Sequence, residues 1–209
     1  TPSFLVLFSP ELFRMDVEHC LDDDSYFPFD EFIETVIMVF SRDPSVLDRC
    51  AERVHPRIVG YTKGGQEVGN VPPCGVQPFR GLVNYVAPLS FVFESSEDAF
   101  FVFREMFCKY FCKLNTISGK KSNIVFLGKL FEDLLSEHDP NLVHHLLSVG
   151  IPPLQIAFSW IQLGFVGYFP VDQVLCLWDR VLAFGPEHGL MLLPILAAAI
   201  FVFRSTTLM

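Results

Sequence analysis

The stretch PVDQVLCLWDRVLAFG, Pro170–Gly185, contains the clearest single element of this 209-residue chain. Proline suits the first position of a helix, where its missing N–H is not needed, and glycine suits the position just past the end. The apolar residues between them recur at helical spacing and form one stripe: Val171, Val174, Leu175, Trp178 and Leu182. The pattern predicts a helix over about 171–183 that buries one face.

The same helical period recurs on both sides of this stretch. Further helices are predicted over residues 29–40, 95–112, 123–136, 139–147, 154–165 and 190–203. Ser95 and Asp98 have the spacing of a capping box at the start of one of them. Hydrophobic residues make up 51% of the chain and charged residues 19%, which allows a sizeable core and argues against disorder. The sequence therefore predicts an all-α fold.

Residues 54–81 break this helical pattern. The segment is rich in glycine and proline, which favour turns and interrupt helices. Within it, VGYTKGGQEVG at residues 59–69 fits a short hairpin. Long loops inside compact domains are often functional. We therefore expect one all-α domain over residues 1–209 with a long irregular Gly/Pro-rich loop over about 54–81.

Charge and hydropathy narrow the possible partners. A nucleic-acid surface needs clustered Lys and Arg, so a net charge of −9 argues against a nucleic-acid partner. The longest apolar run, GLMLLPILAAAIFVF at residues 189–203, contains Pro194 and is shorter than the roughly 20 residues of a membrane span. We expect a cytoplasmic protein without a transmembrane segment. The alternative, a fragment of a helical membrane protein, depends on this run.

The cysteines and the common catalytic motifs give no sign of a cofactor. The six cysteines lie mostly within apolar runs: Cys20, Cys50, Cys74, Cys108, Cys112 and Cys176. Cys108 and Cys112 stand four residues apart among aromatic residues, a pattern more typical of core packing than of zinc. SGKKS at residues 118–122 lacks the glycine and hydroxyl residue of a phosphate-binding loop. We expect free thiols in a reducing compartment, no metal and no cofactor.

The stretch LFRMDVEHC, Leu12–Cys20, places Asp16, Glu18 and His19 within about one helical turn. The cluster fits acid–base chemistry, but it also fits the solvated face of an ordinary helix. The periodicity of the stretch favours the solvated face.

FSWIQLGFVGYFPVDQVLCLWDRVLAFG, residues 158–185, resembles the C-terminal half of a TBC domain. This is the all-helical Tre-2/Bub2/Cdc16 module, known as a GTPase-activating domain for Rab GTPases. Trp160, the helix start at Phe169-Pro170 and LWDR at residues 177–180 carry the resemblance. YVAPLSFVFESSEDAFFVF at residues 85–103 is a second match. The family's N-terminal helices have no counterpart here, so we expect a partial TBC domain over residues 1–209.

The resemblance implies a mechanism with two fingers. An Arg from an I-x-x-D-x-x-R motif and a Gln from a Y-x-Q-G motif enter the active site of the GTPase. Arginine offers a fixed, permanently charged fork to the transferring phosphoryl group. Glutamine both accepts and donates hydrogen bonds, so it can orient the attacking water.

The first motif aligns with residues 13–19, where Asp16 keeps the acidic place. His19 stands at the arginine-finger position, and a neutral imidazole lacks the guanidinium fork and its permanent charge. Arg14 lies five residues before His19, about 140° around a helix, and should therefore point elsewhere.

The second motif aligns without a gap on Pro78–Gly81, anchored by residues 87–89 downstream. Arg80 then stands at the glutamine-finger position and Gly81 is kept. A rival alignment uses Gln77 as the glutamine finger, but it loses the Tyr and the Gly and needs inserted residues. We favour the alignment without a gap.

The resemblance therefore implies a regulator of Rab-family GTPases in membrane traffic, which binds the GTP form of its partner and is not itself an enzyme. Since both finger positions are substituted, by His19 and Arg80, we expect weak or no GTPase-activating activity. The alternative is a non-catalytic Rab-binding scaffold or effector module.

Overall fold

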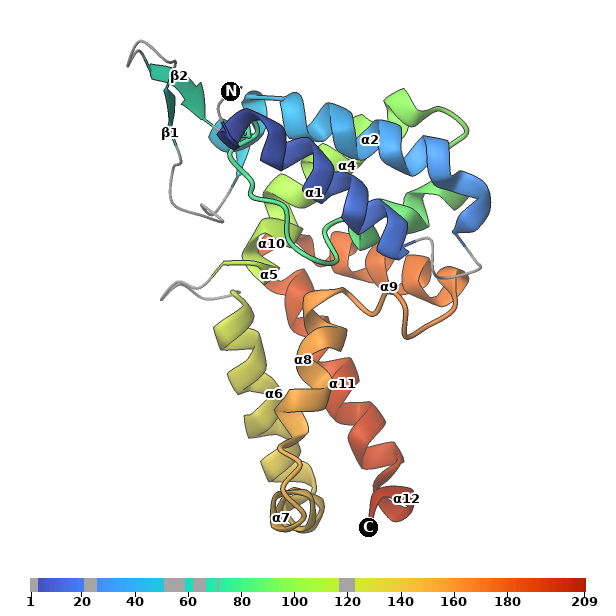
Figure 1. The fold of residues 1–209 in the computed structure, drawn as a ribbon. Coiled ribbons are helices and arrows are strands. Elements are labelled where there is room, and N and C mark those ends of the chain that lie inside the picture. The colour runs from blue at the N-terminus through green and yellow to red at the C-terminus, as the bar shows by residue number, and fades with distance from the viewer. Residues whose placement is uncertain (1–3, 21–25, 51–58, 62–66, 71, 117–122) are drawn as a thin grey trace. The chain divides into compact units, whose positions relative to one another are not determined.

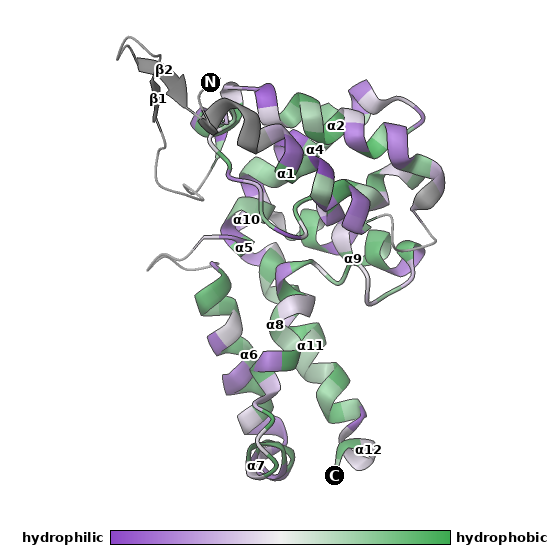
Figure 2. Ribbon diagram, viewed as in Figure 1, coloured by the Kyte–Doolittle hydropathy of each residue, from purple (hydrophilic) through white to green (hydrophobic). Residues whose placement is uncertain are grey.

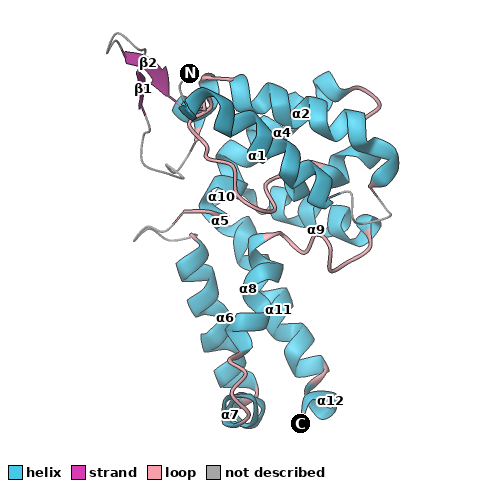
Figure 3. Cartoon of the chain, viewed as in Figure 1, coloured by secondary structure: helices cyan, strands magenta, loops and turns pink. Residues whose placement is uncertain are grey.

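The computed structural model describes residues 4–20, 26–50, 59–61, 67–70, 72–116 and 123–209. The chain divides into two compact units, an N-terminal unit (residues 1–112) and a C-terminal unit (residues 113–209), which are described separately. Figure 3 shows that helices dominate the described residues of both units, as the all-α prediction requires. A single domain over residues 1–209 stays a prediction.

The N-terminal unit consists of helices and one hairpin (Figure 1). Its elements are α1 (Phe4–Cys20), η1 (Phe27–Phe29), α2 (Asp30–Arg42), α3 (Ser45–Arg49), β1 (Val59–Tyr61), β2 (Glu67–Asn70), η2 (Val83–Tyr85), η3 (Ala87–Phe91), α4 (Ser96–Met106) and the π-helical turn η4 (Phe107–Phe111). The division between the units falls within the short helix α5 (Cys112–Leu114).

Helix α2 packs against both α1 and α4. Its buried face includes Ile33, Val36 and Ile37, three positions of the predicted helix over residues 29–40. The ring of Phe40 lies 4.8 Å from that of Phe103 and 5.1 Å from that of Phe107. Aromatic rings of both α4 and η4 therefore pack on the end of α2.

The expected hairpin is confirmed, since β1 and β2 pair antiparallel with Gly60 opposite Gly69. The helix expected over 95–112 is present, but it changes form near its end. The side chain of Ser95 accepts a hydrogen bond from the backbone N–H of Glu97, so it caps α4. The chain then continues through η4, whose wider turns were not predicted.

The C-terminal unit is helical throughout its described part. Its elements are α6 (Ile124–His138), α7 (Pro140–Ser148), α8 (Pro153–Gln162), α9 (Val171–Ala183), α10 (Gly185–His188), η5 (Gly189–Met191), α11 (Leu192–Phe203) and α12 (Ser205–Leu208). Helices α6, α8 and α11 pack against one another, and Figure 2 shows that most of α11 is hydrophobic. Phe201 of α11 lies 5.4 Å from Phe131 of α6 and 5.6 Å from Trp160 of α8, measured between ring centroids.

Helix α9 begins and ends at the predicted residues, but its buried face differs from the predicted stripe. Four residues at positions i, i+3, i+4 and i+7 are buried: Val174, Leu177, Trp178 and Val181. Leu182, which we placed on the stripe, is exposed, because the buried face is turned toward the row that contains Leu177. Trp178 donates a hydrogen bond from Nε1 to the carbonyl oxygen of Gly164, 3.0 Å away.

Within the described residues, the stretch Gly185–Phe203 is long and apolar enough to cross a membrane by length and composition. Helices α7 and α8 meet the same criterion only as a pair, bent by 107°. Core helices of soluble proteins also meet it, so the finding is weak evidence. The absence of a transmembrane segment stays a prediction.

Candidate functional site

The buried face of α1 contains one carboxylate. Phe13, Asp16, Val17 and Cys20 follow the i, i+3, i+4, i+7 spacing, and all four are buried. Glu18 and His19 are exposed. The solvated-face interpretation of Leu12–Cys20 is therefore right for Glu18 and His19 and wrong for Asp16.

Asp16 binds the chain segment that precedes and begins η2. One carboxylate oxygen accepts a hydrogen bond of 2.7 Å from the backbone N–H of Gly81, and the other accepts one of 2.8 Å from that of Val83. Gly81 has a φ of +96°, a conformation that glycine adopts without a steric penalty. The two bonds join α1 to a segment 65 and 67 residues away in the sequence.

Opposing effects act on the ionisation of Asp16. Burial has the largest effect and raises the pKa of the carboxyl above its ordinary value. The hydrogen bonds from Gly81 and Val83 lower the pKa, as do the charges of His19 and Arg80, but they do not cancel the effect of burial. His19 and Arg80 therefore lie close enough to influence the same carboxylate.

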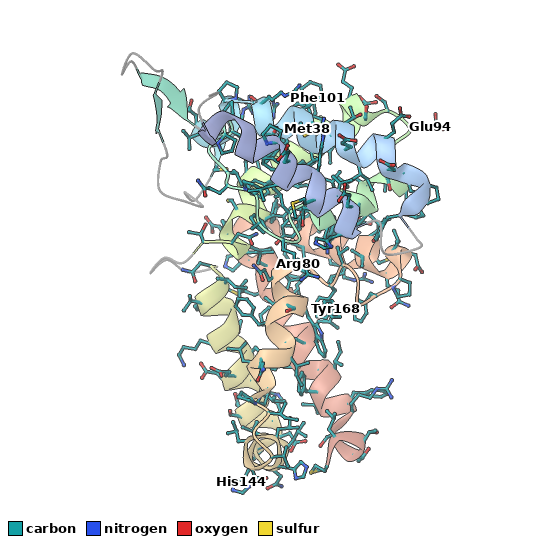
Figure 4. The ribbon with its side chains drawn as sticks, viewed as in Figure 1. Met38, Arg80, Glu94, Phe101, His144 and Tyr168 are labelled. Atoms are coloured by element: carbon teal, nitrogen blue, oxygen red, sulfur yellow. The ribbon has the colours of Figure 1, made fainter. Side chains whose placement is uncertain are left out.

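A pocket of about 180 Å³ lies between α1 and this segment. It is lined by Leu12, Met15, Asp16, His19, Pro78, Phe79 and Arg80. Arg80, labelled in Figure 4, is exposed to solvent, as is His19. The pocket thus combines one buried acid, two basic side chains and an apolar wall.

The structure brings together three of the four residues singled out from the sequence, namely Asp16, His19 and Arg80. Gln77 is half-buried and is not among the residues that line the pocket. Arg14 donates a hydrogen bond of 3.0 Å from Nε to Glu34 of α2, so it points away from the pocket, as expected. The finger roles of His19, Arg80, Asp16 and Gln77 stay predictions.

Sequence reasoning did not predict that Asp16 binds the second motif directly. A signal was present, because Asp16 occupies a position on the apolar row of Phe13, Val17 and Cys20, where a carboxylate requires hydrogen-bond donors. The identity of the donors, two backbone amides far along the chain, had no local signal.

The pocket can bind an anionic or hydrogen-bond-accepting group. A guanidinium presents several N–H donors in a planar fork and suits carboxylate or phosphate oxygens. An imidazole can add a donor or an acceptor according to its protonation. In the part of the chain that the structure describes, no three His, Cys, Asp or Glu side chains are placed to hold a metal ion.

Comparison with known proteins adds independent findings. The family model "Rab-GTPase-TBC domain" matches residues 77–209, a range that includes Arg80 and begins after α1. Human TBC1 domain family member 19 is 42% identical over 192 residues, which cover 90% of this chain and 36% of that protein. No solved structure matches.

More distant relatives are similar over about half of the chain. A TBC domain-containing protein kinase-like protein of Dictyostelium discoideum is 23% identical over 104 residues, which cover 50% of this chain and 10% of that protein. GTPase-activating protein GYP5 of Saccharomyces cerevisiae is 28% identical over 108 residues, which cover 52% of this chain and 12% of that protein. The chain thus spans 36% or less of the length of these three relatives.

Proposed function

The chain belongs to the Rab-GTPase-TBC domain family, and from that premise we propose that it binds the GTP form of a Rab-family small GTPase at the pocket of Asp16, His19 and Arg80. The observation that supports this is the pair of hydrogen bonds from Gly81 and Val83 to Asp16. These bonds join α1, which carries His19, to the segment that carries Arg80, and we assign these two residues to the finger positions of the family.

The side chains at these positions differ from those that the family mechanism uses. Histidine at position 19 lacks the bidentate, permanently charged group that stabilises a transferring phosphoryl group. Arginine at position 80 has donors but no acceptor, so it cannot accept a hydrogen bond from an attacking water as glutamine can. The proposed function is therefore Rab binding with weak or no acceleration of GTP hydrolysis.

A second candidate function is residual activation through Arg80. Its guanidinium is exposed at the pocket and lies on a segment fixed by Asp16. If a bound GTPase places its phosphates against this segment, Arg80 supplies the positive charge from the place of the glutamine. The first candidate is a scaffold or effector, and this second one is an activator.

One assay separates the two candidates. A panel of Rab proteins is loaded with GTP, and both binding and single-turnover hydrolysis are measured with the wild-type chain and with His19→Ala, Arg80→Ala and Gln77→Ala. We expect at least one Rab to bind, with little acceleration of hydrolysis. Arg14→Ala is the matched control, because it removes an exposed cation of α1 that pairs with Glu34 outside the pocket.

The variants also decide between the two alignments of the glutamine motif. Loss of a measured activity in Arg80→Ala, with Gln77→Ala unchanged, supports catalysis by Arg80. The reverse result favours the rival alignment. Strong acceleration that survives both His19→Ala and Arg80→Ala contradicts the proposal that these positions form the site.

The cellular setting follows from the proposed partner. A Rab-binding module acts in vesicle and membrane traffic, in the cytoplasm, and reaches endomembranes through its membrane-attached partner. We expect the expressed chain to stay in the aqueous fraction without detergent. A requirement for detergent would instead favour a membrane role for Gly185–Phe203.

A further inference from the structure

Three thiols of the N-terminal unit gather where α3 ends beside η4. The thiol of Cys50, the residue that follows α3, donates to the sulfur of Cys108 in η4 over 3.7 Å. Cys112 donates from its sulfur to the carbonyl oxygen of Cys108 over 3.1 Å. None of the three is in a disulfide bond, and they come from two segments of the chain far apart in sequence. The arrangement is independent of the pocket at Asp16.

The two thiols in contact differ in access. Cys50 is half-buried, whereas Cys108 is 1% exposed. A small reagent therefore reaches Cys50 first, and the sulfur of Cys108 lies behind it. This order, an accessible thiol backed by a buried one, is what a two-step oxidation to a disulfide requires.

The described residues offer little support for other uses of these thiols. No group of three His, Cys, Asp or Glu side chains among them is placed to hold a metal ion, so coordination does not explain the contact. Packing alone explains a buried cysteine such as Cys74, whose sulfur interacts with the backbone of Val76. It does not require two sulfurs from different segments to lie against each other.

We propose that Cys50 and Cys108 are a redox-active pair, which a low-molecular-weight disulfide oxidises to an intramolecular disulfide. The thiolate of Cys50 attacks one sulfur of the oxidant, forms a mixed disulfide and releases the first small thiolate, which takes up a proton. The thiolate of Cys108 then attacks the sulfur of Cys50 and releases the second. The protein loses two protons and two electrons, and the oxidant takes them up and becomes two thiols.

The surroundings of Cys50 slow the formation of this disulfide. Hydrogen bonds with Cys108 and Cys112, together with burial, raise the pKa of the Cys50 thiol, so its thiolate is scarce at neutral pH. A thiol of high pKa is also a poor leaving group, so an attack on the disulfide that releases Cys50 is slow. To form the disulfide, the two sulfurs must move from 3.7 Å apart to a bond of about 2.0 Å.

The disulfide between Cys50 and Cys108 closes a large covalent loop, since the two residues are 58 positions apart in the sequence. This loop contains Pro78, Phe79 and Arg80, the part of the pocket that does not come from α1. A disulfide restricts the unfolded chain more when it closes a longer loop. We expect the oxidised protein to unfold at a higher denaturant concentration than the reduced protein.

The test uses the full chain, reduced and then incubated with oxidised and reduced glutathione at several ratios. Remaining thiols are blocked by alkylation, and linked peptides are identified by mass spectrometry without reduction. We expect a peptide pair joining Cys50 to Cys108 that grows with the oxidant ratio and forms faster as the pH rises from 7 to 9, roughly the range in which thiols begin to ionise. In Cys108→Ser the oxidation should stop at the mixed disulfide between glutathione and Cys50.

Cys176→Ser is the matched control, because Cys176 is an exposed cysteine outside the N-terminal unit and its loss should not change the linkage. The proposal is overturned if, once the exchange has reached equilibrium, Cys50 stays free at an oxidant ratio at which Cys176 carries glutathione. It is also overturned if Cys50 pairs with Cys112 instead of Cys108. The peptide map of the wild-type chain decides the question even if a variant does not fold.

Discussion

A buried carboxylate is stable only where hydrogen-bond donors replace the water that it loses. Asp16 meets this condition with the amides of Gly81 and Val83, and the same bonds fix the segment that carries Arg80. The stability of the core and the shape of the pocket therefore both depend on the side chain of Asp16. Substitutions at this residue should change both.

The first prediction concerns Asp16→Ala. The change leaves two buried backbone N–H groups without their acceptor, and each such loss costs about 1–3 kcal/mol. Because the variant also removes a costly buried charge, we expect a net loss of about 2 kcal/mol in the free energy of unfolding. Chemical denaturation measures it, and hydrogen exchange at the amides of Gly81 and Val83 should become faster.

Glu18→Ala is the matched control, since Glu18 is an exposed carboxylate on the same helix. Its effect should stay within about 0.5 kcal/mol. Equal losses in the two variants would mean that the bonds of Asp16 contribute nothing beyond helix formation.

The second prediction concerns pH. The pKa of Asp16 is raised in the folded protein, mainly by burial, so folding favours the protonated carboxyl. This contribution to stability is complete below the ordinary pKa of 3.8 and is lost as the pH rises through the folded pKa. In Asp16→Asn the side chain at this position does not titrate, so the variant lacks this pH-dependent contribution to stability. The unfolding free energy of the wild type minus that of Asp16→Asn should therefore fall as the pH rises above 3.8 and level off above the folded pKa.

The measurement is a series of denaturant titrations of both proteins across this range. A difference that rises with pH would mean that the hydrogen bonds outweigh burial and that the carboxylate is the favoured form.

The third prediction concerns Asp139, which joins two elements of the C-terminal unit. Asp139 accepts a hydrogen bond from the hydroxyl of Ser205, which begins α12, and another from the backbone N–H of Leu142 in α7. The bond from Ser205 is the main reason why the pKa of Asp139 lies below its ordinary value. Ser205→Ala should raise this pKa, and an NMR titration of the carboxyl carbon measures it.

The stabilisation that Asp139 provides is present above its ordinary pKa and is lost as the pH falls through the folded pKa. Ser205→Ala should therefore reduce the loss of stability that the C-terminal unit shows at low pH because of Asp139. Ser148→Ala is a suitable control, because its hydroxyl donates to His145 rather than to Asp139. An unchanged pKa in Ser205→Ala would show that the bond does not persist in solution.

At the scale of elements, local signals predicted the helices well. Pro170 and Gly185 bracket α9, and the helix runs over Val171–Ala183 as predicted, because caps and breakers act within a few residues. The prediction of which face of this helix is buried was partly wrong. Apolar residues lie on both sides of the predicted stripe, and the neighbouring helices decide which row is covered. The π-helical turn η4 and the bonds of Asp16 were not predicted, because they depend on contacts with distant segments.

The fourth prediction concerns the approach of α9 to η5. A Cβ atom on Gly189 would overlap the backbone carbonyl oxygen of Val181, and backbone cannot move aside as a side chain can. We expect Gly189→Ala to lower the free energy of unfolding by about 3 kcal/mol or more, the upper range for overpacking. Thermal or chemical denaturation measures the loss.

Gly128→Ala is the matched control in the same unit. A Cβ atom at this position of α6 would lie 3.5 Å from two methyl carbons of Leu154, an ordinary contact. Alanine also favours helix by about 1 kcal/mol over glycine. The variant should be as stable as the wild type or slightly more stable. A similar loss in both variants would mean that the close approach at Gly189 is not specific.

At the scale of the molecule, the resemblance stated from the sequence and the family match agree on a TBC domain. The all-α fold could be predicted from the helical periodicity. The positions of the second motif stay a prediction, made because the aligned residues run without a gap into Ala87–Leu89. The proximity of Asp16, His19 and Arg80 was only implied by the resemblance. Composition and periodicity could not supply it, since it requires α1 to meet a segment more than sixty residues away.

The last prediction tests the proposed function of the whole chain by restoring the two fingers. In His19→Arg combined with Arg80→Gln, both positions regain the side chains of the family motifs on a pocket that Asp16 still holds. A supplied arginine is worth about 10³–10⁵ in GTPase rate, so even an imperfect geometry should raise acceleration at least tenfold, roughly, over the wild type. The readout is single-turnover GTP hydrolysis on the Rab that binds most tightly.

The control variant is His19→Ala combined with Arg80→Ala. It shows whether any acceleration comes from the new Arg and Gln side chains or from the removal of the original ones. We expect this variant to give no acceleration, because it removes both groups and supplies neither. If the Arg/Gln variant binds the Rab as well as the wild type and still gives no acceleration, the pocket does not face the phosphates of the bound GTPase. Binding through this chain would then serve recruitment alone, and the scaffold function would be the better account of the molecule.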